Sequence, residues 1–377
     1  RRTGEALGKC RSRGVNLRED DPRLVVVVGA GGAGKTTLAA ALGLASAAAG
    51  RDTLVITFDP SLRLKDTLGV GDAARDTEVL VPGADLGASA GTLAASLLDA
   101  RGTFDRLVAR YAPDATARDR ILRNRFYRDL AGGLAGILEY MAVERLFEIA
   151  QSGRYQRIVL DTPPTRQALD FLEAPRRIVA FLDSGALKLG LKPWFDERGK
   201  FRPPGVRGLL GRPMEAVLDE VVGIDFLREL SEFFQAFGPL YSGFHERATE
   251  VETLLQAKET LFLLVSGPGA ERVPDALFFA RKLEETGHRL GPLIVNRVHP
   301  EFAAPRASTQ GAEAEGRNLM AWLGERDRAG LEHLRSLVPA SRGVVALPLW
   351  AKEPTDLRAL ARLGADLAAE LAAVPSS

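Results

Sequence analysis

A nine-residue stretch, GAGGAGKTT, matches the phosphate-binding pattern G-x-x-x-x-G-K-[S/T]. Glycines in such a loop let backbone N–H groups turn toward a phosphate, and a helix that starts at the loop adds partial positive charge. In this pattern Lys35 reaches the β- and γ-phosphates, and the Thr36 hydroxyl is a ligand of Mg²⁺. The sequence therefore predicts a site for a nucleoside triphosphate and Mg²⁺. Its residues are Gly29, Ala30, Gly31, Gly32, Ala33, Gly34, Lys35, Thr36 and Thr37.

The segments on both sides of this loop are the ones that a phosphate-binding loop requires. Residues 24–28 form an uninterrupted apolar run, which is typical of a strand buried in a parallel sheet. Residues 38–49 are rich in Ala and Leu and are followed by Gly50, which predicts a helix that ends at this glycine. With strand, loop and helix in this order, a glycine-rich turn that fits the pattern by chance is the weaker interpretation.

Two aspartates follow other apolar runs, and both are candidates for chemistry at the phosphates. Asp161 comes after residues 157–160, and we expect it to orient Mg²⁺ through a water molecule. Asp59 comes after residues 54–58, at the carboxyl edge of the predicted sheet, where a carboxylate can position or deprotonate an attacking water. The alternative for each is structural, namely a cap at Asp161 and a turn before Pro60 at Asp59.

The whole chain alternates apolar runs with helix-like segments. This pattern predicts an α/β fold in which a mostly parallel sheet has helices on both faces. After a basic lead-in at residues 1–22, we expect a single domain over residues 23–377. Two stretches, at about 92–150 and 184–260, exceed ordinary crossovers, and we interpret them together as a helical subdomain at the ligand end of the sheet. Further strands are predicted at residues 79–81, 261–265, 293–295 and 344–347.

Both long stretches carry patterns that bear on what this subdomain does. The first reads as mostly helical, and Leu93, Leu97 and Leu98 lie near helical spacing. The second contains aromatic residues at helical spacings, which predicts either plain helix packing or a hydrophobic groove for a client helix. Residues 184–213 are basic and contain several Gly and Pro, as in a solvated loop, a gate or a membrane-surface contact. The aromatic residues are Phe226, Phe233, Phe234, Phe237, Tyr241 and Phe244.

The composition limits the classes of function. Among 377 residues, 50 are Lys or Arg and 49 are Asp or Glu, so the net charge of +1 argues against a global field for nucleic acid. Cys10 is the single cysteine, so this sequence has no disulfide framework or multi-cysteine metal site, which fits the reducing cytoplasm. No apolar run is long enough to predict a transmembrane helix.

Five motifs occur in a fixed order along the chain. They are GAGGAGKTT (29–37), TFDPSLRLKD (57–66), LDTPPTRQALDFL (160–172), IVNRVHP (294–300) and LPLWAKEP (347–354). Together they resemble the arsenite-pump and tail-anchored-protein-targeting ATPase family, in its bacterial anion-transporting branch. The resemblance spans about residues 23–362, and the third motif is the most specific. It implies ATP and Mg²⁺ as ligands and a face-to-face dimer as the working form.

The resemblance also implies roles for individual residues. Asp59 matches a switch aspartate that activates water, and Asp161 matches a second switch acid near Mg²⁺, followed by a γ-phosphate-sensing loop at Thr162–Gln167. Asn296 matches an asparagine that reads the adenine edge, although an Asn at a strand end is otherwise a turn or cap residue. Leu347-Pro348 would form part of the adenine pocket.

The sequence departs from the family pattern at Ala30. This position holds a signature lysine in relatives, and that lysine reaches the phosphates of the partner subunit, as an arginine finger does. The loss removes a positive charge where negative charge develops in the reaction. Either hydrolysis is slow, or the charge comes from another residue or another subunit. Arg63 and Arg166, in the two switch loops, are candidates, with a solvated loop charge as the simpler interpretation of each.

Other departures concern the client. Cys10 alone cannot form the three-thiolate arsenite site of relatives, and the Cys-x-x-Cys zinc clip of the eukaryotic targeting factors is absent. With three methionines, the chain also lacks their methionine-rich client groove.

These observations predict a cytoplasmic Mg²⁺-dependent ATPase that works as a homodimeric or heterodimeric switch. We expect nucleotide state to change the helical subdomain, which would bind a hydrophobic helical client or a partner. Nucleic acid is not expected as a partner, and any membrane contact would be peripheral. The main alternative is a weakly hydrolysing subunit paired with a paralogue that carries the signature lysine. A partitioning ATPase on DNA or a membrane surface is a further alternative, against which the near-neutral charge weighs.

Overall fold

The computed structural model describes most of the predicted domain. The described residues are 22–58, 63–71, 74–75, 77–82, 90–112, 114–124, 137–183, 241–302 and 311–374. Several features singled out in the sequence lie outside them, namely the lead-in with Cys10, Asp59, residues 184–213 and the aromatic residues Phe226, Phe233, Phe234 and Phe237. The backbones of Arg63, Arg166 and Tyr241 belong to described helices, but their side chains are also outside the description.

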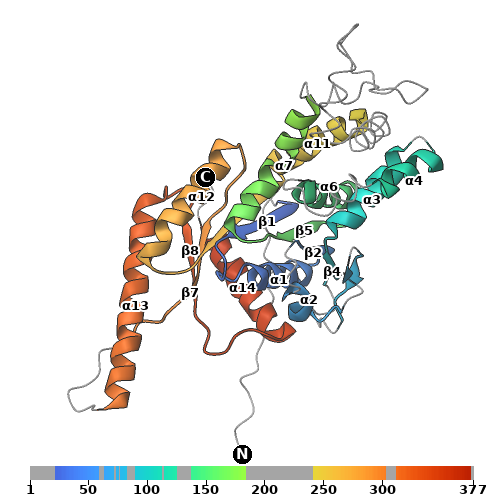
Figure 1. Cartoon of the computed structure of the whole chain (residues 1–377). Coiled ribbons are helices and arrows are strands. Elements are labelled where there is room, and N and C mark those ends of the chain that lie inside the picture. Colours follow the sequence, from blue (N-terminus) through green and yellow to red (C-terminus); the bar gives the residue numbers. More distant parts are fainter. Residues whose placement is uncertain are drawn as a thin grey trace, which may run out of the picture.

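A central sheet of eight strands carries the fold (Figure 1). The strand order is β3-β4-β2-β5-β1-β6-β7-β8, and only the pair β3 and β4 is antiparallel among the described strands. This arrangement confirms the predicted α/β fold with a mostly parallel sheet. The strands are β1 (Leu24–Gly29), β2 (Thr53–Thr57), β3 (Val79–Leu80), β4 (Leu93–Leu97), β5 (Arg157–Asp161), β6 (Thr260–Ser266), β7 (Leu293–Val298) and β8 (Val344–Pro348).

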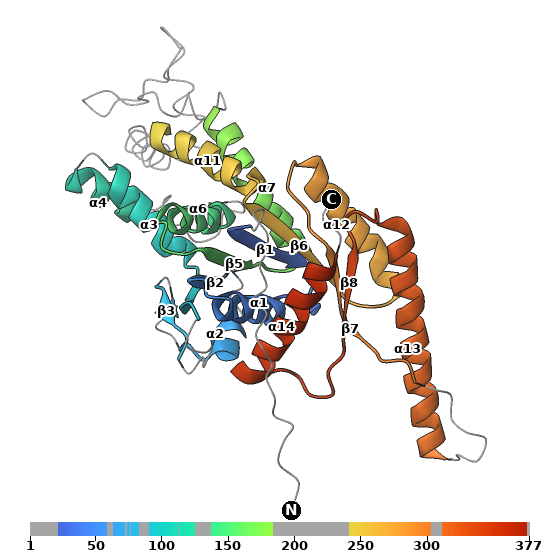
Figure 2. The same cartoon turned by 180° about the vertical axis from the view of Figure 1, so that it is seen from behind.

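Helices cover both faces of the sheet (Figures 1 and 2). On one face lie α1 (Lys35–Ala48), α2 (Arg63–Leu68) and α14 (Leu357–Ala373), which share an apolar core with Val25 and Val27 of β1. On the other face Leu24, Val26 and Val28 pack with the remaining sheet-covering helices. Side chains of β1 therefore alternate between two cores, as expected for a strand buried on both faces. The helices of the second face are α6 (Ile137–Gln151), α7 (Thr165–Asp183), α11 (Tyr241–Gln256), α12 (Val273–Glu285) and α13 (Ala312–Leu337), with the short 3₁₀ helix η3 (Ala270–Arg272) before α12.

A third apolar cluster lies apart from the sheet, where helices pack on helices. It joins α3 (Ala100–Tyr111) and α4 (Ala115–Arg123) to one end each of α6, α7 and α11. Phe244 of α11 is buried in this cluster, with its ring centroid 6.2 Å from those of Phe104 and Tyr111. Plain helix packing therefore accounts for Phe244, the one member of the predicted aromatic group whose side chain is described.

The expectation of helix around Leu93, Leu97 and Leu98 was wrong. Residues 93–97 form β4, which pairs in parallel with β2 and is buried along its whole length. The reason is geometric, because a spacing of four residues brings side chains to one side in both a helix and a strand of period two. Leu93 and Leu97 accordingly share a core with Ala95, while Ala94 points to the opposite one.

The two stretches expected to form a helical subdomain, at about 92–150 and 184–260, also contribute helices that cover the sheet. Met141 of α6 lies in the third cluster, whereas Leu146 and Ile149 of the same helix pack against the sheet. In α11, Val251 and Leu255 likewise pack against the sheet. The described helices that stand clear of the sheet are therefore α3, α4 and the adjoining ends of α6, α7 and α11.

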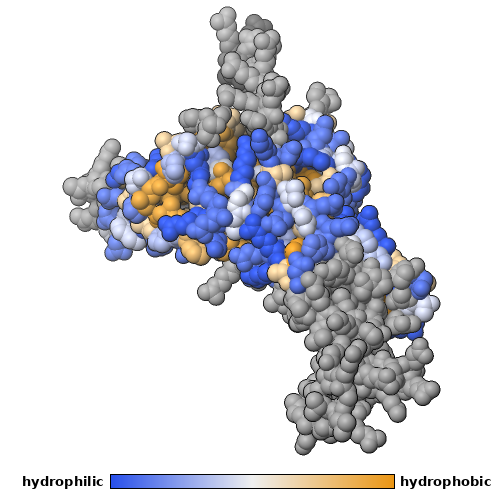
Figure 3. Space-filling model, turned by 90° about the horizontal axis from the view of Figure 1, so that it is seen from above, coloured by the Kyte–Doolittle hydropathy of each residue, from blue (hydrophilic) through white to orange (hydrophobic). Residues whose placement is uncertain are grey.

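The surface seen from above is largely hydrophilic, with one denser hydrophobic area at the left of the view (Figure 3). Large exposed apolar side chains among the described residues include Phe278 of α12 and Leu319 and Trp322 of α13. None of the helices in the described part of the chain has both the length and the apolar character that crossing a bilayer requires.

Candidate nucleotide-binding site

The glycine loop between β1 and α1 has the backbone that the sequence predicts for it. Helix α1 begins at Lys35, and its N-cap residue Gly34 has a left-handed backbone with φ of 91°. A Cβ atom on Gly34 would lie 2.4 Å from Nδ2 of Asn296, and one on Gly29 would lie 1.9 Å from the carbonyl oxygen of Val265. Only glycine fits these two positions, because both combine a positive φ with a close neighbour.

Three side chains meet beneath this loop. Thr36 Oγ1 donates a hydrogen bond of 2.8 Å to Asp161 Oδ2, and Thr57 Oγ1 donates one of 3.0 Å to the same oxygen. Asp161 is fully buried at the end of β5, and Thr57 ends the neighbouring β2. The parallel strands β1, β5 and β2 therefore bring the phosphate loop and the predicted Mg²⁺ carboxylate together at one edge of the sheet.

Lys35 lies folded against its own loop. Its Nζ donates a hydrogen bond of 3.1 Å to the carbonyl oxygen of Ala30, and the residue is buried. Nearby, the hydroxyl of Thr162 donates a 2.8 Å hydrogen bond to the carbonyl oxygen of Val27, which ties the chain after β5 to β1. Two residues later, Pro164 lines the cavity beside Gly31.

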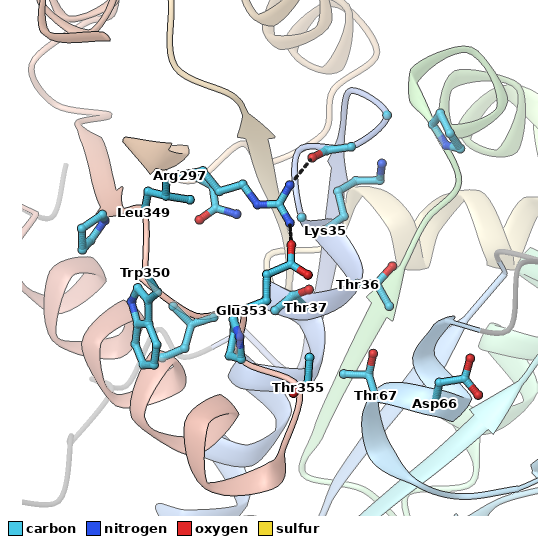
Figure 4. A pocket seen from close by; sticks show the side chains of 18 residues that line it. Lys35, Thr36, Thr37, Asp66, Thr67, Arg297, Leu349, Trp350, Glu353 and Thr355 are labelled. Atoms are coloured by element: carbon cyan, nitrogen blue, oxygen red, sulfur yellow. Dashed lines mark hydrogen bonds and ion pairs between the residues drawn. The ribbon is translucent and has the colours of Figure 1, made fainter. Parts of the chain in front are cut away.

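A cavity of about 490 Å³ opens beside the loop (Figure 4). This size lies within the range of small-molecule sites. Several of the predicted residues lie together in its lining, while Ala30 and Ala33 are not part of it. The predicted residues that line it are Gly31, Gly32, Gly34, Lys35, Thr36, Thr37, Asn296 and Pro348.

The side of the cavity predicted for adenine is built by the ends of β7 and β8. Asn296 is buried, and its Nδ2 donates a 2.8 Å hydrogen bond to the carbonyl oxygen of Ala33. Pro348 lines the cavity, but the side chain of Leu347 is buried in the apolar core below it. The cavity wall continues instead through Leu349 and Trp350, which the sequence did not single out.

Sequence reasoning also missed charged residues of the lining. Arg297, Glu353 and Asp66 all line the cavity, and Figure 4 shows Arg297 between the loop and Glu353. Arg297 follows Asn296 in the motif IVNRVHP, and Glu353 lies in LPLWAKEP, so the quoted motifs already contained both residues. Their position beside the loop was the missing information.

The end of β7 is anchored to α13 on the side away from the loop. Asp327, buried in α13, accepts a 3.0 Å hydrogen bond from the backbone N–H of His299 and lies 2.6 Å from its Nδ1. Arg326 donates to the other carboxylate oxygen at 2.8 Å. Burial raises the pKa of Asp327, but these hydrogen bonds outweigh it and hold the pKa below its usual value. The segment with Asn296 and Arg297 is thereby held in place.

The residues present fit both a nucleotide phosphate and Mg²⁺. Gly31, Gly32 and Gly34 line the cavity together with the first residues of α1, so an anion can reach the N-terminus of this helix. The Thr36 hydroxyl and the Asp161 carboxylate are hard oxygen donors that lie together, and Mg²⁺ in such sites uses one or two protein oxygens along with phosphates and water.

Comparisons with known proteins agree with this geometry. Residues 22–190 match the family model of the anion-transporting ATPases. The uncharacterized protein SCO2128 of Streptomyces coelicolor is 29% identical over 320 residues, which cover 83% of this chain and 72% of that protein.

Two further relatives match over shorter stretches. The ATPase get3 of Neurospora crassa is 32% identical over 155 residues, which are 41% of this chain and 43% of that protein. Protein Rv2184c of Mycobacterium tuberculosis is 33% identical over 159 residues, 41% of this chain and 37% of that protein. The matches to these two proteins thus cover less than half of each. The family match thus assigns residues 22–190, a little less than half of this chain, to the anion-transporting ATPases.

Proposed function

We propose that this protein binds ATP and Mg²⁺ at the loop of residues 29–37 and hydrolyses the nucleotide. The observation that carries the proposal is the contact between Thr36 and Asp161 at the start of α1, where Gly31, Gly32 and Gly34 line a cavity. A loop that only closed a turn would not need a fully buried carboxylate at its base, because moving a carboxylate out of water costs free energy. The match of residues 22–190 to the anion-transporting ATPases supports the same conclusion.

In this proposal the residues of the site have separate roles in binding the phosphates, the metal, the attacking water and the base. Backbone N–H groups at the start of α1 would hold the phosphates, and Lys35 would leave the Ala30 carbonyl to contact the β- and γ-phosphates. Thr36 would ligate Mg²⁺ directly and Asp161 through water, and the metal would supply charge neutralisation at the transferred phosphoryl group. Asp59 would position the attacking water, and Asn296 with Pro348 would hold adenine.

We infer that ATP acts here as a switch between two subunits in the cytoplasm. In this proposal nucleotide closes a dimer, and hydrolysis reopens it and changes the helices that pack outside the sheet. The fungal relative is named an ATPase, which supports hydrolysis by the matched part of this chain. A client or partner helix would bind the helical subdomain.

A second candidate function rests on Ala30. Because the loop lacks a lysine there, the chain would be a weakly hydrolysing subunit whose partner, a lysine-containing paralogue, supplies the missing charge in trans. The two candidates differ in whether the protein alone turns over ATP.

The substitution Lys35→Ala tests the site. We expect it to abolish Mg²⁺-ATP binding or lower it by on the order of 100-fold, since it removes the charge-assisted contacts to the phosphates. Calorimetric titration and a phosphate-release assay measure both properties. Lys282→Ala, which removes an exposed lysine of α12, is the matched control. Wild-type affinity and turnover in Lys35→Ala would rule the site out.

A further inference from the structure

The strand β7 is irregular at the point where it meets the phosphate loop. Its pairing with β8 shifts register between Val295 and Val298, which marks a bulge at Asn296 and Arg297. Arg297 has a φ of 63°, and it is the one described residue other than glycine with a positive φ. A side chain other than Gly, Asn or Asp seldom adopts this backbone, and such outliers gather at functional sites.

The bulge changes where two neighbouring side chains point. In a regular strand successive side chains project to opposite faces. Here Asn296 reaches the carbonyl oxygen of Ala33, and Arg297 Nη1 donates a 3.3 Å hydrogen bond to the carbonyl oxygen of Gly32. Both side chains therefore contact the phosphate loop, which is how bulges next to binding sites re-aim a side chain.

The guanidinium of Arg297 is held at the loop by one carboxylate. Its Nη2 donates a 2.8 Å hydrogen bond to Glu353 Oε1, on the segment between β8 and α14 (Figure 4). The side chains of Arg297 and Glu353 are 45% and 72% exposed. Water screens such a pair, so the contact contributes a factor of about five or less to an equilibrium. A stronger anion can take the place of Glu353.

The charges that line the cavity favour an exchange of Glu353 for a phosphate. Among the described residues that line it, Lys35 and Arg297 are positive, and Asp66 and Glu353 are negative. A nucleotide brings several further negative charges, so a carboxylate next to the loop opposes its binding. Arg297 is the described cation that contacts the loop from outside it.

We propose that Arg297 is a second phosphate-binding cation of this site, and that Glu353 holds it until a nucleotide arrives. The arginine exchanges the Glu353 carboxylate for a phosphate oxygen of the bound nucleoside polyphosphate. This releases the segment that joins β8 to α14. The inference rests on the proposed function, because it assumes that the cavity binds a nucleotide.

Calorimetric titration of the full chain with Mg²⁺-ATP and Mg²⁺-GTP tests the exchange in three variants. Arg297→Gln should weaken both nucleotides by about tenfold and to the same extent, because a charged hydrogen bond to phosphate is lost and the base is not read. Glu353→Gln should strengthen both by up to about fivefold, because the competing carboxylate is gone. When both substitutions are combined, Glu353→Gln should no longer increase the affinity, because the arginine that the carboxylate holds is absent.

Two control variants exclude a nonspecific effect of charge removal and an effect of misfolding. Glu313→Gln removes an exposed carboxylate that pairs with Arg317 on α13, away from the cavity, and should leave affinity unchanged. Arg297→Asn suits the positive φ and keeps the backbone, so weak binding by both Arg297 variants, with unchanged melting temperatures, cannot come from misfolding.

The outcomes separate this inference from the proposed function. Wild-type affinity in Arg297→Gln, or weakened or unchanged binding in Glu353→Gln, would overturn the exchange, while a loss of binding in Lys35→Ala would still uphold the site. Absence of Mg²⁺-ATP binding by the wild-type protein would overturn both.

Discussion

Thr36 and Asp161 are 125 residues apart in the sequence, and a 2.8 Å hydrogen bond joins them at the base of the phosphate loop. The contact exists because β1 and β5 are parallel neighbours, with Val27 opposite Asp161. Any ion held between the hydroxyl and the phosphates would therefore be within reach of the carboxylate. The predicted Mg²⁺ site thus depends on strand order as much as on the loop motif.

The Mg²⁺ dependence of hydrolysis tests this pair. Asp161→Asn keeps the shape but removes the charge, and we expect it to raise the Mg²⁺ concentration for half-maximal turnover by about 10- to 100-fold. Thr36→Val should act in the same direction, while Thr36→Ser keeps the hydroxyl and should stay close to wild type. An unchanged Mg²⁺ titration in Asp161→Asn would remove this residue from the metal site.

The second prediction concerns Asp59, which follows β2. If its carboxylate positions or activates water, Asp59→Asn should keep ATP affinity and lower turnover by on the order of 100-fold or more. Asp66 is a good control, since it is an exposed carboxylate that lines the same cavity, and Asp66→Asn should retain turnover. The opposite result, with Asp66 required and Asp59 dispensable, would reassign the base.

Base preference tests Asn296. Its amide can offer a donor and an acceptor to the edge of adenine. Asn296→Ala also loses the hydrogen bond to Ala33, so the informative quantity is the ratio of ATP to GTP affinity, not either value alone. We expect the ratio to fall toward one. Equal wild-type affinities for the two nucleotides in calorimetry would show that Asn296 does not read the base.

The missing lysine leads to a prediction about dimers. In Ala30→Lys a new ammonium would face the phosphates of a partner subunit if two loops already meet, and turnover should then rise with protein concentration. If the natural partner is a paralogue, this variant changes little, and adding that paralogue should stimulate the wild-type protein. Rapid wild-type turnover by a strict monomer, independent of concentration, would argue against charge supplied in trans.

The stability of the fold should depend on pH through His288. This residue is 7% exposed, its Nδ1 lies 2.7 Å from Thr286 Oγ1, and its ring packs edge-on against Phe262. Burial, followed by the charge of Arg176, lowers the pKa of His288 to about 4, although Glu252 acts in the opposite direction. The folded protein therefore keeps a neutral imidazole at a pH where the unfolded chain is protonated.

This difference fixes the sign of the effect. Between an unfolded pKa of about 6.5 and the folded value, the unfolded chain binds more protons, so the free energy of unfolding decreases as pH falls. The neutral His288 contributes fully to the free energy of unfolding at a pH above its pKa in the unfolded chain. About 3 kcal/mol of this contribution is lost as the pH falls to its pKa in the folded protein. Urea unfolding of wild type, His288→Gln and the control His333→Gln between pH 7.5 and 5 measures it. If the free energy of unfolding of His288→Gln depended on pH as strongly as that of the wild type, His288 would not be the source of the pH dependence.

The sequence by itself was sufficient for features that arise locally. The apolar run before the glycine loop and the Ala-rich segment after it predicted β1 and α1, because strand, loop and helix follow one another without a long connection. The predicted runs at residues 157–160, 261–265 and 344–347 are also strands, since continuous apolar segments fit strands that are covered on both faces of a parallel sheet, although Val344 and Ala346 in the edge strand β8 are only partly buried.

Only the tertiary structure decided features that depend on pairing between distant segments. The spacing of Leu93 and Leu97 fits a helix and a strand equally, and the open edge of β2 determined that they form β4. Arg297 and Gly32 are 265 residues apart, and no sequence spacing relates them. They meet because β7 is bulged where it lies beside the loop, and the bulge turns the arginine side chain toward the glycine loop.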